Sequence, residues 1–518
     1  MPAEPPCPVA PVRGAGIRRA SWPVRPVAIL LACALALPAA ARAETVTKQY
    51  DNGGVYEGSF REGLQHGHGT YRLPSGYEYT GEWVEGRIEG QGVARFPNGA
   101  VYEGSFVDGR PHGTGRIVFA DGGTYEGEWV EGAMHGTGVA EYANGLRYEG
   151  EFVDGLHHGT GVVEGPDGYR YEGEWVAGRK EGSGRIEYAD GAVYEGMLAA
   201  DEPHGTGRLE MPDGLVYEGE WVEGRIEGQG RLVQPGGDVY EGGFVAGRRS
   251  GQGRAEYANG DVYVGGFADD LHHGAGRLET ADGHVYEGAW VAGRMDGEGR
   301  AEYPDGSVYV GEFADGRPHG RGTITYADGS AYEGEWAEGV IAGEGTARYP
   351  DGVTYAGTFA DGRNHGTGVL EMPDGYRYEG GWRDGLRHGE AEVVYPDGTR
   401  YEGTFVEGRR EGTGRLVTPE GFEFEGAWVD GVLHGEGVAR YPTGDVYEGA
   451  FHGGAREGFG IMRFADGSSY EGYWLDGEPV SEAVYRAARE DADAGAVPPE
   501  PAAGSPADAV TTETPDEG

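Results

Sequence analysis

The sequence predicts an all-β protein: an elongated single-layer antiparallel sheet of stacked 23-residue β-hairpins. Three observations lead to this fold class. One 23-residue pattern repeats without insertion or deletion, glycine recurs at fixed places within it, and apolar residues alternate with polar ones as they do on strands. With 103 glycines and only 38% hydrophobic residues, the 518-residue chain has too little aliphatic material for several conventional cores, yet it is too aromatic for a disordered polymer.

The repeat begins at Tyr56, and every step of 23 residues lands on an aromatic residue that is followed two residues later by glycine. Nineteen copies follow in phase, the last starting at Tyr470 and incomplete. We number the positions of each copy from 0, at this aromatic residue, to 22. Glycine recurs at positions 2, 7, 11, 13 and 20, with Asp201, Asp270 and Ala391 as exceptions. A helical solenoid is excluded, because each glycine costs a helix roughly 1 kcal/mol.

Each copy has two strand-like segments and two turn signals. In residues 125–129, period-2 alternation places Tyr125, Gly127 and Trp129 on one face, and the glycine leaves room for the flanking rings. A second strand is predicted at 138–142. Asn98-Gly99 and its equivalents at positions 19 and 20 predict a tight hairpin turn, because both residues accept positive φ. A longer loop, such as 108–113, is predicted to reverse the chain at the other end of the hairpin.

Aromatic side chains at positions 0 and 4 are the candidate packing and interaction residues. Trp and Phe largely alternate at position 4, which predicts interdigitation of large and smaller rings along the sheet. One hairpin alone buries too little surface to fold, so neighbouring copies are expected to stack. The candidate aromatic residues are Tyr79, Trp83, Tyr125, Trp129, Tyr171, Trp175, Tyr217, Trp221, Tyr286, Trp290, Tyr332, Trp336, Tyr378 and Trp382.

The motif at residues 171–175, Tyr-Glu-Gly-Glu-Trp, continued by Gly182 and Gly184, resembles the membrane occupation and recognition nexus (MORN) repeat. The resemblance covers residues 56 to about 477. In that family the repeats form elongated hairpin arrays that act as scaffolds, protein-binding surfaces or membrane tethers. Some members, such as plant phosphatidylinositol phosphate kinases, join the array to a catalytic domain, and we expect none here. Together with the export signal described next, the resemblance implies a bacterial exported member of the family.

The first 43 residues are predicted to be a secretory signal peptide. They combine a basic segment, an apolar run at 27–37 that is too short to span a bilayer, and small residues at Ala41 and Ala43 before a predicted cleavage site. A twin-arginine signal at Arg18-Arg19, a lipoprotein-like Cys33 and a downstream translation start are alternatives. The chain is therefore expected to be periplasmic or secreted. Both cysteines, Cys7 and Cys33, lie in this segment.

The remaining boundaries follow from the phase of the repeat. Residues 44–55 match the second half of a repeat and are predicted to form a strand that pairs with the first full hairpin. The array covers 56–477. A short capping helix is predicted at 478–490, where it would cover the exposed sheet edge, and an acidic Pro/Ala-rich disordered tail at 491–518.

The composition and spacing argue against an enzyme, and we expect no catalytic residue, cofactor or metal. Ten histidines share position 10, but copies about 10 Å apart cannot bring nitrogens onto one zinc ion. Glutamate pairs such as Glu126 and Glu128 recur in equivalent surroundings, whereas an acid and a base need different ones. The Gly-x-Gly pairs precede no helix that could hold phosphate, and no nucleophile motif, EF-hand or calcium nonapeptide is present.

The function expected from the sequence is a non-catalytic scaffold for protein partners in the cell envelope or outside the cell. Nucleic acid is an unsuitable partner, since 88 Asp and Glu outnumber 42 Lys and Arg and give a net charge of -46. Peripheral association with membrane phospholipid is the alternative, opposed by the same charge. Saccharide binding on stacked rings is a third, and pairing into a homodimer is left open. The arginines that would serve lipid contact are Arg87, Arg110, Arg179, Arg225 and Arg317 at position 8.

Overall fold

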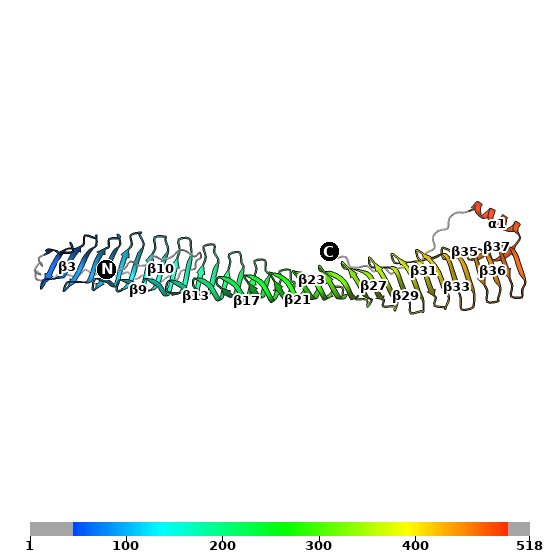
Figure 1. Cartoon of the computed structure of the whole chain (residues 1–518), viewed down its shortest axis with the longest axis horizontal. Coiled ribbons are helices and arrows are strands. Elements are labelled where there is room, and N and C mark those ends of the chain that lie inside the picture. The colour runs from blue at the N-terminus through cyan, green and yellow to red at the C-terminus, as the bar shows by residue number, and fades with distance from the viewer. Residues whose placement is uncertain (1–44, 496–518) are drawn as a thin grey trace, which may run out of the picture. The chain divides into compact units, whose positions relative to one another are not determined.

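The computed structural model describes residues 45–495. These residues form one antiparallel sheet of 39 strands that does not close on itself, followed by a single helix (Figure 1). The predicted all-β hairpin array is therefore confirmed. The predicted signal peptide, with Ala41 and Ala43, and the tail from residue 496 lie outside the described residues.

The chain divides into two compact units, and within each unit consecutive strands pair with one another. Unit 1 contains the described residues up to 259 together with 267–270, and unit 2 contains 260–266 and the residues from 271 onward. The first nineteen strands are β1 (Val46–Gln49), β2 (Val55–Arg61), β3 (Leu64–Arg72), β4 (Glu78–Val84), β5 (Arg87–Arg95), β6 (Val101–Val107), β7 (Arg110–Val118), β8 (Thr124–Val130), β9 (Ala133–Glu141), β10 (Arg147–Val153), β11 (Leu156–Glu164), β12 (Arg170–Val176), β13 (Arg179–Glu187), β14 (Val193–Ala199), β15 (Glu202–Glu210), β16 (Val216–Val222), β17 (Arg225–Val233), β18 (Val239–Val245) and β19 (Arg248–Glu256).

The remaining elements continue the same alternation of seven-residue and nine-residue strands. They are β20 (Val262–Ala268), β21 (Leu271–Glu279), β22 (Val285–Val291), β23 (Arg294–Glu302), β24 (Val308–Ala314), β25 (Arg317–Thr325), β26 (Ala331–Ala337), β27 (Val340–Arg348), β28 (Thr354–Ala360), β29 (Arg363–Glu371), β30 (Arg377–Arg383), β31 (Leu386–Val394), β32 (Arg400–Val406), β33 (Arg409–Val417), β34 (Glu423–Val429), β35 (Val432–Arg440), β36 (Val446–His452), β37 (Ala455–Arg463), β38 (Ser469–Leu475), β39 (Glu478–Val480) and α1 (Glu482–Gly495).

Hairpins along the array contain a bulge at the same place, directly after the glycine at position 2. In the β12–β13 pair, Tyr171 faces Ile186 and Gly173 faces Gly184, but the next residue, Glu174, faces Glu181. The extra residues of β13 include Gly182 at position 11, whose φ of 65° lies in the left-handed region. Glycine adopts this conformation without the strain that a Cβ atom would add. The bulge explains why position 11 is conserved as glycine from copy to copy of the array.

The turns correct the sequence prediction. The tight two-residue turn joins the strands at positions 6 and 7, as at Glu62 and Gly63, whose φ values are 51° and 80°. Two successive left-handed residues are typical of a type I′ hairpin turn, so the loop expected at 108–113 is a two-residue turn followed directly by β7. The prediction had assigned this geometry to Asn98-Gly99 instead.

At positions 19 and 20 the chain makes a wider turn, in which only the glycine has positive φ. The N–H of Gly99 donates to the carbonyl of Phe96 at 2.9 Å, and Gly99 has a φ of 94°. The Asn98 Oδ1 atom accepts a hydrogen bond from the N–H of Ala100 at 3.0 Å. Asn and Asp are therefore favoured at position 19 because their side chains bond the backbone two residues ahead, not because their φ is positive.

Rings at positions 0 and 4 form an edge-to-face file along the buried face of the sheet. The Tyr102 ring contacts Phe106 of its own repeat and Trp129 of the next, each with centroids 5.0 Å apart. Aromatic pairs favour this geometry because the positive edge of one ring meets the negative face of the other. Each of eight tryptophans also donates from Nε1 to the carbonyl at position 13 of the preceding repeat, at 3.0 to 3.3 Å: Trp83, Trp129, Trp175, Trp221, Trp290, Trp336, Trp382 and Trp428.

The position 0 tyrosine lies flat over two glycines of its own hairpin. A Cβ atom on Gly173 would lie 2.5 Å from the Tyr171 Oη atom, and one on Gly184 would lie 2.5 Å from its Cε2 atom. The sequence predicted that the glycine at position 2 leaves room for flanking rings. The structure shows that the ring accommodated by both glycines is the position 0 tyrosine of the same hairpin. The Tyr171 hydroxyl ends the arrangement by donating to the carbonyl of Glu174 at 2.7 Å.

Both ends of the described chain add short elements to the sheet. At the N-terminal end, β1 pairs with β2 in the register expected for the second half of a repeat. At the C-terminal end, residues 478–480, which were predicted to be part of the helix, form β39 and pair with β38. The helix α1 begins at Glu482, where Ser481 Oγ accepts a hydrogen bond from the N–H of Val484, and it continues to Gly495, beyond the predicted end at 490.

Candidate interaction surfaces

The predicted aromatic residues are all at the buried face of the sheet. Trp382 is the most exposed of the fourteen, with 8% of its surface accessible, and Tyr79, Tyr125, Tyr171, Tyr217, Tyr286 and Tyr378 have none. Burial raises the pKa of Tyr217 and of Tyr286 to about 12. The rings pack repeats together, and a partner would have to displace neighbouring side chains to reach their faces.

Some of the histidines at position 10 accept hydrogen bonds from the turn of the following repeat. His158 Nδ1 lies 3.3 Å from the N–H of Ala177, and His319 Nδ1 lies 3.4 Å from the N–H of Glu338. Where position 10 is glutamate the carboxylate does the same, as Glu181 does for the N–H of Ala200 at 3.1 Å. Histidine and glutamate can both serve as the acceptor for this N–H, while Ala342 at the same position offers no side-chain acceptor.

Glutamates at position 3 bond the bulge of their own hairpin. Glu174 Oε1 accepts from the N–H of Ser183 at 3.0 Å and from its hydroxyl at 2.5 Å, and these hydrogen bonds lower the pKa of the Glu174 carboxyl. Glu128 binds Thr137 in the same way. By contrast, Glu126 at position 1 lies in the open and pairs only with Arg116, at 3.8 Å. The two glutamates of each predicted pair thus have different structural surroundings.

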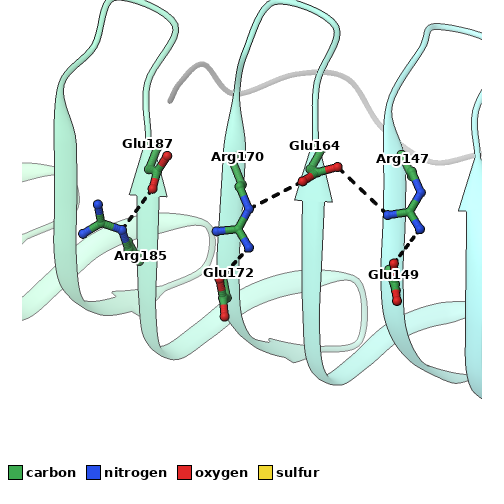
Figure 2. Close-up of polar contacts among 7 residues, drawn as sticks. All are labelled: Arg147, Glu149, Glu164, Arg170, Glu172, Arg185 and Glu187. Carbon is green, nitrogen blue, oxygen red and sulfur yellow. Dashed lines mark hydrogen bonds and ion pairs between the residues drawn. The ribbon is translucent and has the colours of Figure 1, made fainter. Parts of the chain in front are cut away.

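The exposed face of β10–β12 carries a chain of ion pairs (Figure 2). Arg147 reaches Glu149 on its own strand and Glu164 on β11, and Arg170 lies 3.6 Å from the same Glu164 and 2.6 Å from Glu172. Because residues two apart on a strand share a face, arginine and glutamate at alternate places compensate one another. This surface, which we call the outer face, is highly charged but locally close to neutral.

Several arginines at position 8 are also paired, mostly with acids at position 6 of the next repeat. Arg87 Nη1 lies 3.0 Å from Asp108 Oδ1, and Arg110 lies 3.7 Å from Glu131. Arg225 lies 3.8 Å from Glu223 of its own repeat. Three of the five arginines considered for lipid contact are therefore partly neutralised by carboxylates of the array itself, which weakens their attraction for anionic headgroups.

A row of exposed valines at position 5 was missed in the sequence analysis. Val130, Val153 and Val176 are 42%, 36% and 51% exposed on three successive hairpins. Leu156 pairs with Val153 across the turn and is 39% exposed. The strict alternation of each seven-residue strand would have identified this row, because position 5 lies on the face opposite to positions 0, 2 and 4.

The sequence analysis also missed position 9. This position lies next to the buried rings and varies strongly from copy to copy. His157 stacks on Tyr148 with centroids 3.6 Å apart, and burial lowers its pKa to about 4. At the two copies with Asp instead of Gly at position 7, Asp201 Oδ1 accepts from the N–H of Lys180 and Asp270 Oδ1 from that of Arg249, each at 3.0 Å. Each aspartate lies opposite a lysine or arginine at position 9 of the preceding copy. The sequence alone could have indicated this pairing, because both copies with Asp at position 7 follow a copy with a basic residue at position 9.

Two features are absent from residues 45–495. No group of three or more His, Cys, Asp or Glu side chains is arranged to hold a metal ion. The helix of this part of the chain lacks the length and hydropathy needed to cross a bilayer.

These features define a class of protein: an open array of repeated β-hairpins that has a buried aromatic face and a charged, variable outer face. The family model for the MORN repeat matches eighteen segments, from 56–76 and 79–101 through 424–446 and 447–469. The chain therefore belongs to the MORN repeat family. The nineteenth copy, which has a full first strand in β38 and only the short β39 as its second, is not among the matched segments.

Similarity to individual proteins is limited. Alsin from Rattus norvegicus is 44% identical over 50 residues, which are 9% of this chain and 3% of alsin, so this chain spans a very small part of that relative. The TCP10 domain of Danio rerio CPAP in complex with a STIL peptide matches at a TM-score of 0.17, with 17% identity over 46% of this chain and 91% of that one. The Drosophila melanogaster SAS-4 TCP domain matches at a TM-score of 0.19, with 16% identity over 34% of this chain and 85% of that chain.

Proposed function

We propose that this protein is a non-catalytic scaffold that binds protein partners along its outer face, in the cell envelope or outside the cell. Membership of the MORN family supports a repeat scaffold for protein or membrane interaction. The aromatic rings that were predicted as contact residues are buried between the repeats, so the outer face is the surface available to a partner.

One observation supports this proposal above the others: the outer face varies between repeats that are otherwise uniform. Position 1 is glutamate in 15 of the 19 copies, such as the paired Glu172, but Val264 and Val310 occupy it in two others and are 50% and 49% exposed. Position 22, on the same face, is Arg170 in one copy and Glu78 or Val193 in others. Position 0 of the same copies is always a buried ring. A regular frame with a varied surface can present different contacts at defined intervals, as other repeat proteins do.

Site-specific photo-crosslinking in the native host tests the proposal. A photoreactive phenylalanine replaces Val264 or Val310 on the outer face, and the same residue in place of buried Phe313 is the control. We expect the outer-face variants to form reproducible adducts with a small set of envelope proteins, which the control does not form. Adducts with abundant bystanders alone, or equal yields from the control, would contradict the proposal.

The proposed location has its own test. Sequencing the N-terminus of the protein purified from the host is expected to show a chain that begins at Glu44, in an envelope or extracellular fraction. A full-length chain recovered from the cytoplasm would refute export without touching the scaffold proposal.

Association with membrane lipid is the second candidate. Flotation with anionic liposomes at low salt distinguishes it from protein binding. The ion pairs of Arg87 and Arg110 and the net charge of -46 lead us to expect that the protein stays with the unbound fraction. Salt-sensitive flotation that Arg87→Gln reduces would reverse the order of the two candidates.

A further inference from the structure

The helix α1 shows how the outer face of this array holds a helix. The Tyr485 ring stacks on Tyr473 of β38 with centroids 5.1 Å apart and planes at 27°. Arg489 Nη1 lies 2.9 Å from Glu457 Oε1, and the Glu457 side chain is 9% exposed. The helix thus rests on positions 10 and 11 of one repeat, at Glu457 and Gly458, and on position 3 of the next, at Tyr473. We call this surface the helix seat.

An unfilled depression occupies the equivalent place in unit 1. It measures about 470 Å³ and is lined by positions 10, 11 and 12 of one repeat, His158, Gly159 and Thr160, and by position 3 of the next, Glu174. The rest of the lining is formed by Gly173, Trp175, Val176 and Ser183. Since the repeats have the same length and register throughout, the depression on β11–β13 is the counterpart of the helix seat on β37 and β38.

The surroundings of the depression combine exposed apolar and acidic side chains. Val176 in its wall is 51% exposed, and Val153 and Leu156 beside it form an exposed apolar pair. Around them, Glu151 and Glu174 carry carboxylates, each bonded to the bulge of its own hairpin but still open to solvent. A complementary ligand therefore presents an apolar or aromatic group flanked by positive charge.

We propose that this depression is a docking site for an amphipathic helix of a partner protein, in which an aromatic residue is followed four positions later by a basic residue. This proposal rests on the scaffold function proposed above and specifies the partner's chemistry. Residues four apart lie on one face of a helix, as Tyr485 and Arg489 do on α1. The aromatic residue enters the depression beside Val176, and the basic residue meets the carboxylates of Glu151 and Glu174.

The helix seat and the depression differ in their side chains, and this difference further defines the partner. The α1 seat has rings at positions 12 and 3, Phe459 and Tyr473, whose centroids are 5.5 Å apart. The equivalent residues of the depression are Thr160 and Glu174. A helix on β11–β13 therefore stacks less and pairs more charge than α1 does, so its recognition face is more basic than that of α1.

The test uses the full-length protein and a synthetic helix as the probe. The probe is a labelled peptide of residues 481–495 in which Glu490, Asp491 and Asp493 are replaced by lysine, and its affinity is measured by fluorescence anisotropy. We expect binding, and loss of roughly tenfold in affinity when Tyr485 of the peptide becomes Ala, because truncating a central aromatic anchor has effects of this order. A photoreactive group at that position is expected to form adducts with 158–176.

Variants of the protein locate the site. Thr160→Lys is expected to lower the affinity roughly tenfold, because it fills the depression with a charge of the same sign as the peptide's. Thr346→Lys, the same change on the outer face of unit 2, is the matched control and is expected to have no effect. His158→Glu is expected to raise the affinity several-fold at low salt. A glutamate at position 10 still accepts the hydrogen bond from the turn N–H of the next repeat, and it adds a carboxylate like the one that Glu457 supplies to α1.

Two outcomes overturn the proposal: no binding of the peptide at millimolar concentration, or equal effects of Thr160→Lys and Thr346→Lys, which would indicate attraction to the acidic array as a whole. Either result leaves the scaffold function standing if envelope partners still crosslink to the outer face. Failure of that crosslinking together with specific peptide binding would instead leave the helix site without its proposed role.

Discussion

The two faces of a single strand in unit 1 follow opposite rules. On β12, Tyr171 and Trp175 face inward and are 0% and 5% exposed, and their counterparts recur in almost every copy. Arg170 and Glu172 face outward on the same strand and pair at 2.6 Å (Figure 2). The counterpart of Arg170 changes from copy to copy, as at Glu78, Thr124 and Val193, whereas that of Glu172 is glutamate in 15 of the 19 copies. The inner face therefore provides cohesion between repeats, while much of the outer face is free to vary.

The difference has a physical cause. The inner rings gain stability from burial and from contacts with both neighbouring repeats, so any change there propagates to two hairpins. Exposed ion pairs contribute about 0 to 1 kcal/mol each, because water screens them and long side chains lose entropy when they pair. Four predictions sharpen this contrast, in order of decreasing expected effect.

Truncating an inner ring should open its neighbourhood. Tyr171→Ala is expected to lower the local opening free energy of β11–β13 by about 4 kcal/mol, because the ring packs against Trp175 and covers Gly173 and Gly184. Amide hydrogen exchange measures this locally, which suits a repeat array better than a single melting temperature. Glu172→Ala, on the other face of the strand, is the control and should change it by less than about 0.5 kcal/mol. Equal effects would remove the contrast between the faces.

Acid should weaken the array near His157. Burial lowers the pKa of this imidazole from 6.5 to about 4, so below pH 6.5 the unfolded chain binds a proton that the folded chain does not. The stability is complete above pH 6.5 and falls as the pH drops toward 4, by about 2 kcal/mol at pH 5. Hydrogen exchange of β10 and β11 across this range measures the loss. His157→Gln, which places the residue found at Gln65 in that position, should abolish most of the pH dependence, and an unchanged slope would disprove this assignment.

Replacing a tryptophan by the ring of its neighbouring copies should cost less. Trp129→Phe keeps an aromatic ring at position 4, as at Phe106 and Phe152, but removes the Nε1 hydrogen bond to the carbonyl of Gly115 at 3.0 Å. We expect a loss of about 1 kcal/mol, the usual net value of one such bond. Local hydrogen exchange of β7 and β8 is the measurement, with Phe106→Leu as a comparison for the loss of ring contacts. A cost as large as that of Tyr171→Ala would show that shape, and not the hydrogen bond, distinguishes tryptophan here.

Breaking the outer ladder should have the smallest effect. Arg170→Gln removes the ion pairs with Glu164 and Glu172 and is expected to change stability by less than about 0.5 kcal/mol. The difference from the unaltered protein should disappear at 1 M salt. Chemical denaturation at low and high salt provides the measurement. A loss above about 2 kcal/mol that persists in salt would mean that the outer face contributes to cohesion as the inner face does.

Much of the fold follows from the sequence, and the failures have identifiable causes. The period, the glycine positions and the alternation at residues such as Tyr125 and Trp129 predicted the strands and the buried face. The prediction exchanged the two turns because both Asp108-Gly109 and Asn98-Gly99 are favourable turn pairs. Which pair forms the two-residue turn depends on the register of the strands. The start of the helix was misplaced because β39 is stabilised only by pairing with β38.

The candidate site was less predictable than the fold. The fourteen aromatic residues were assigned jointly to packing and to interaction, and only their burial against neighbouring repeats distinguishes the two. The exposed row of Val130, Val153 and Val176 was visible in the alternation, whereas the depression at Thr160 was not. A depression of that kind forms between two repeats and the bulge, so no single segment encodes it.

By itself, the sequence determined that this chain is an array, because a period of 23 residues with glycine at fixed positions admits stacked hairpins and excludes helices. The surface that is available for binding became evident from the packing of the folded repeats. Strand alternation separates two faces but does not say which of them is covered. Burial of the rings requires contacts between hairpins, and the helix seat requires two adjacent repeats held in register, as α1 shows at Tyr473 and Glu457.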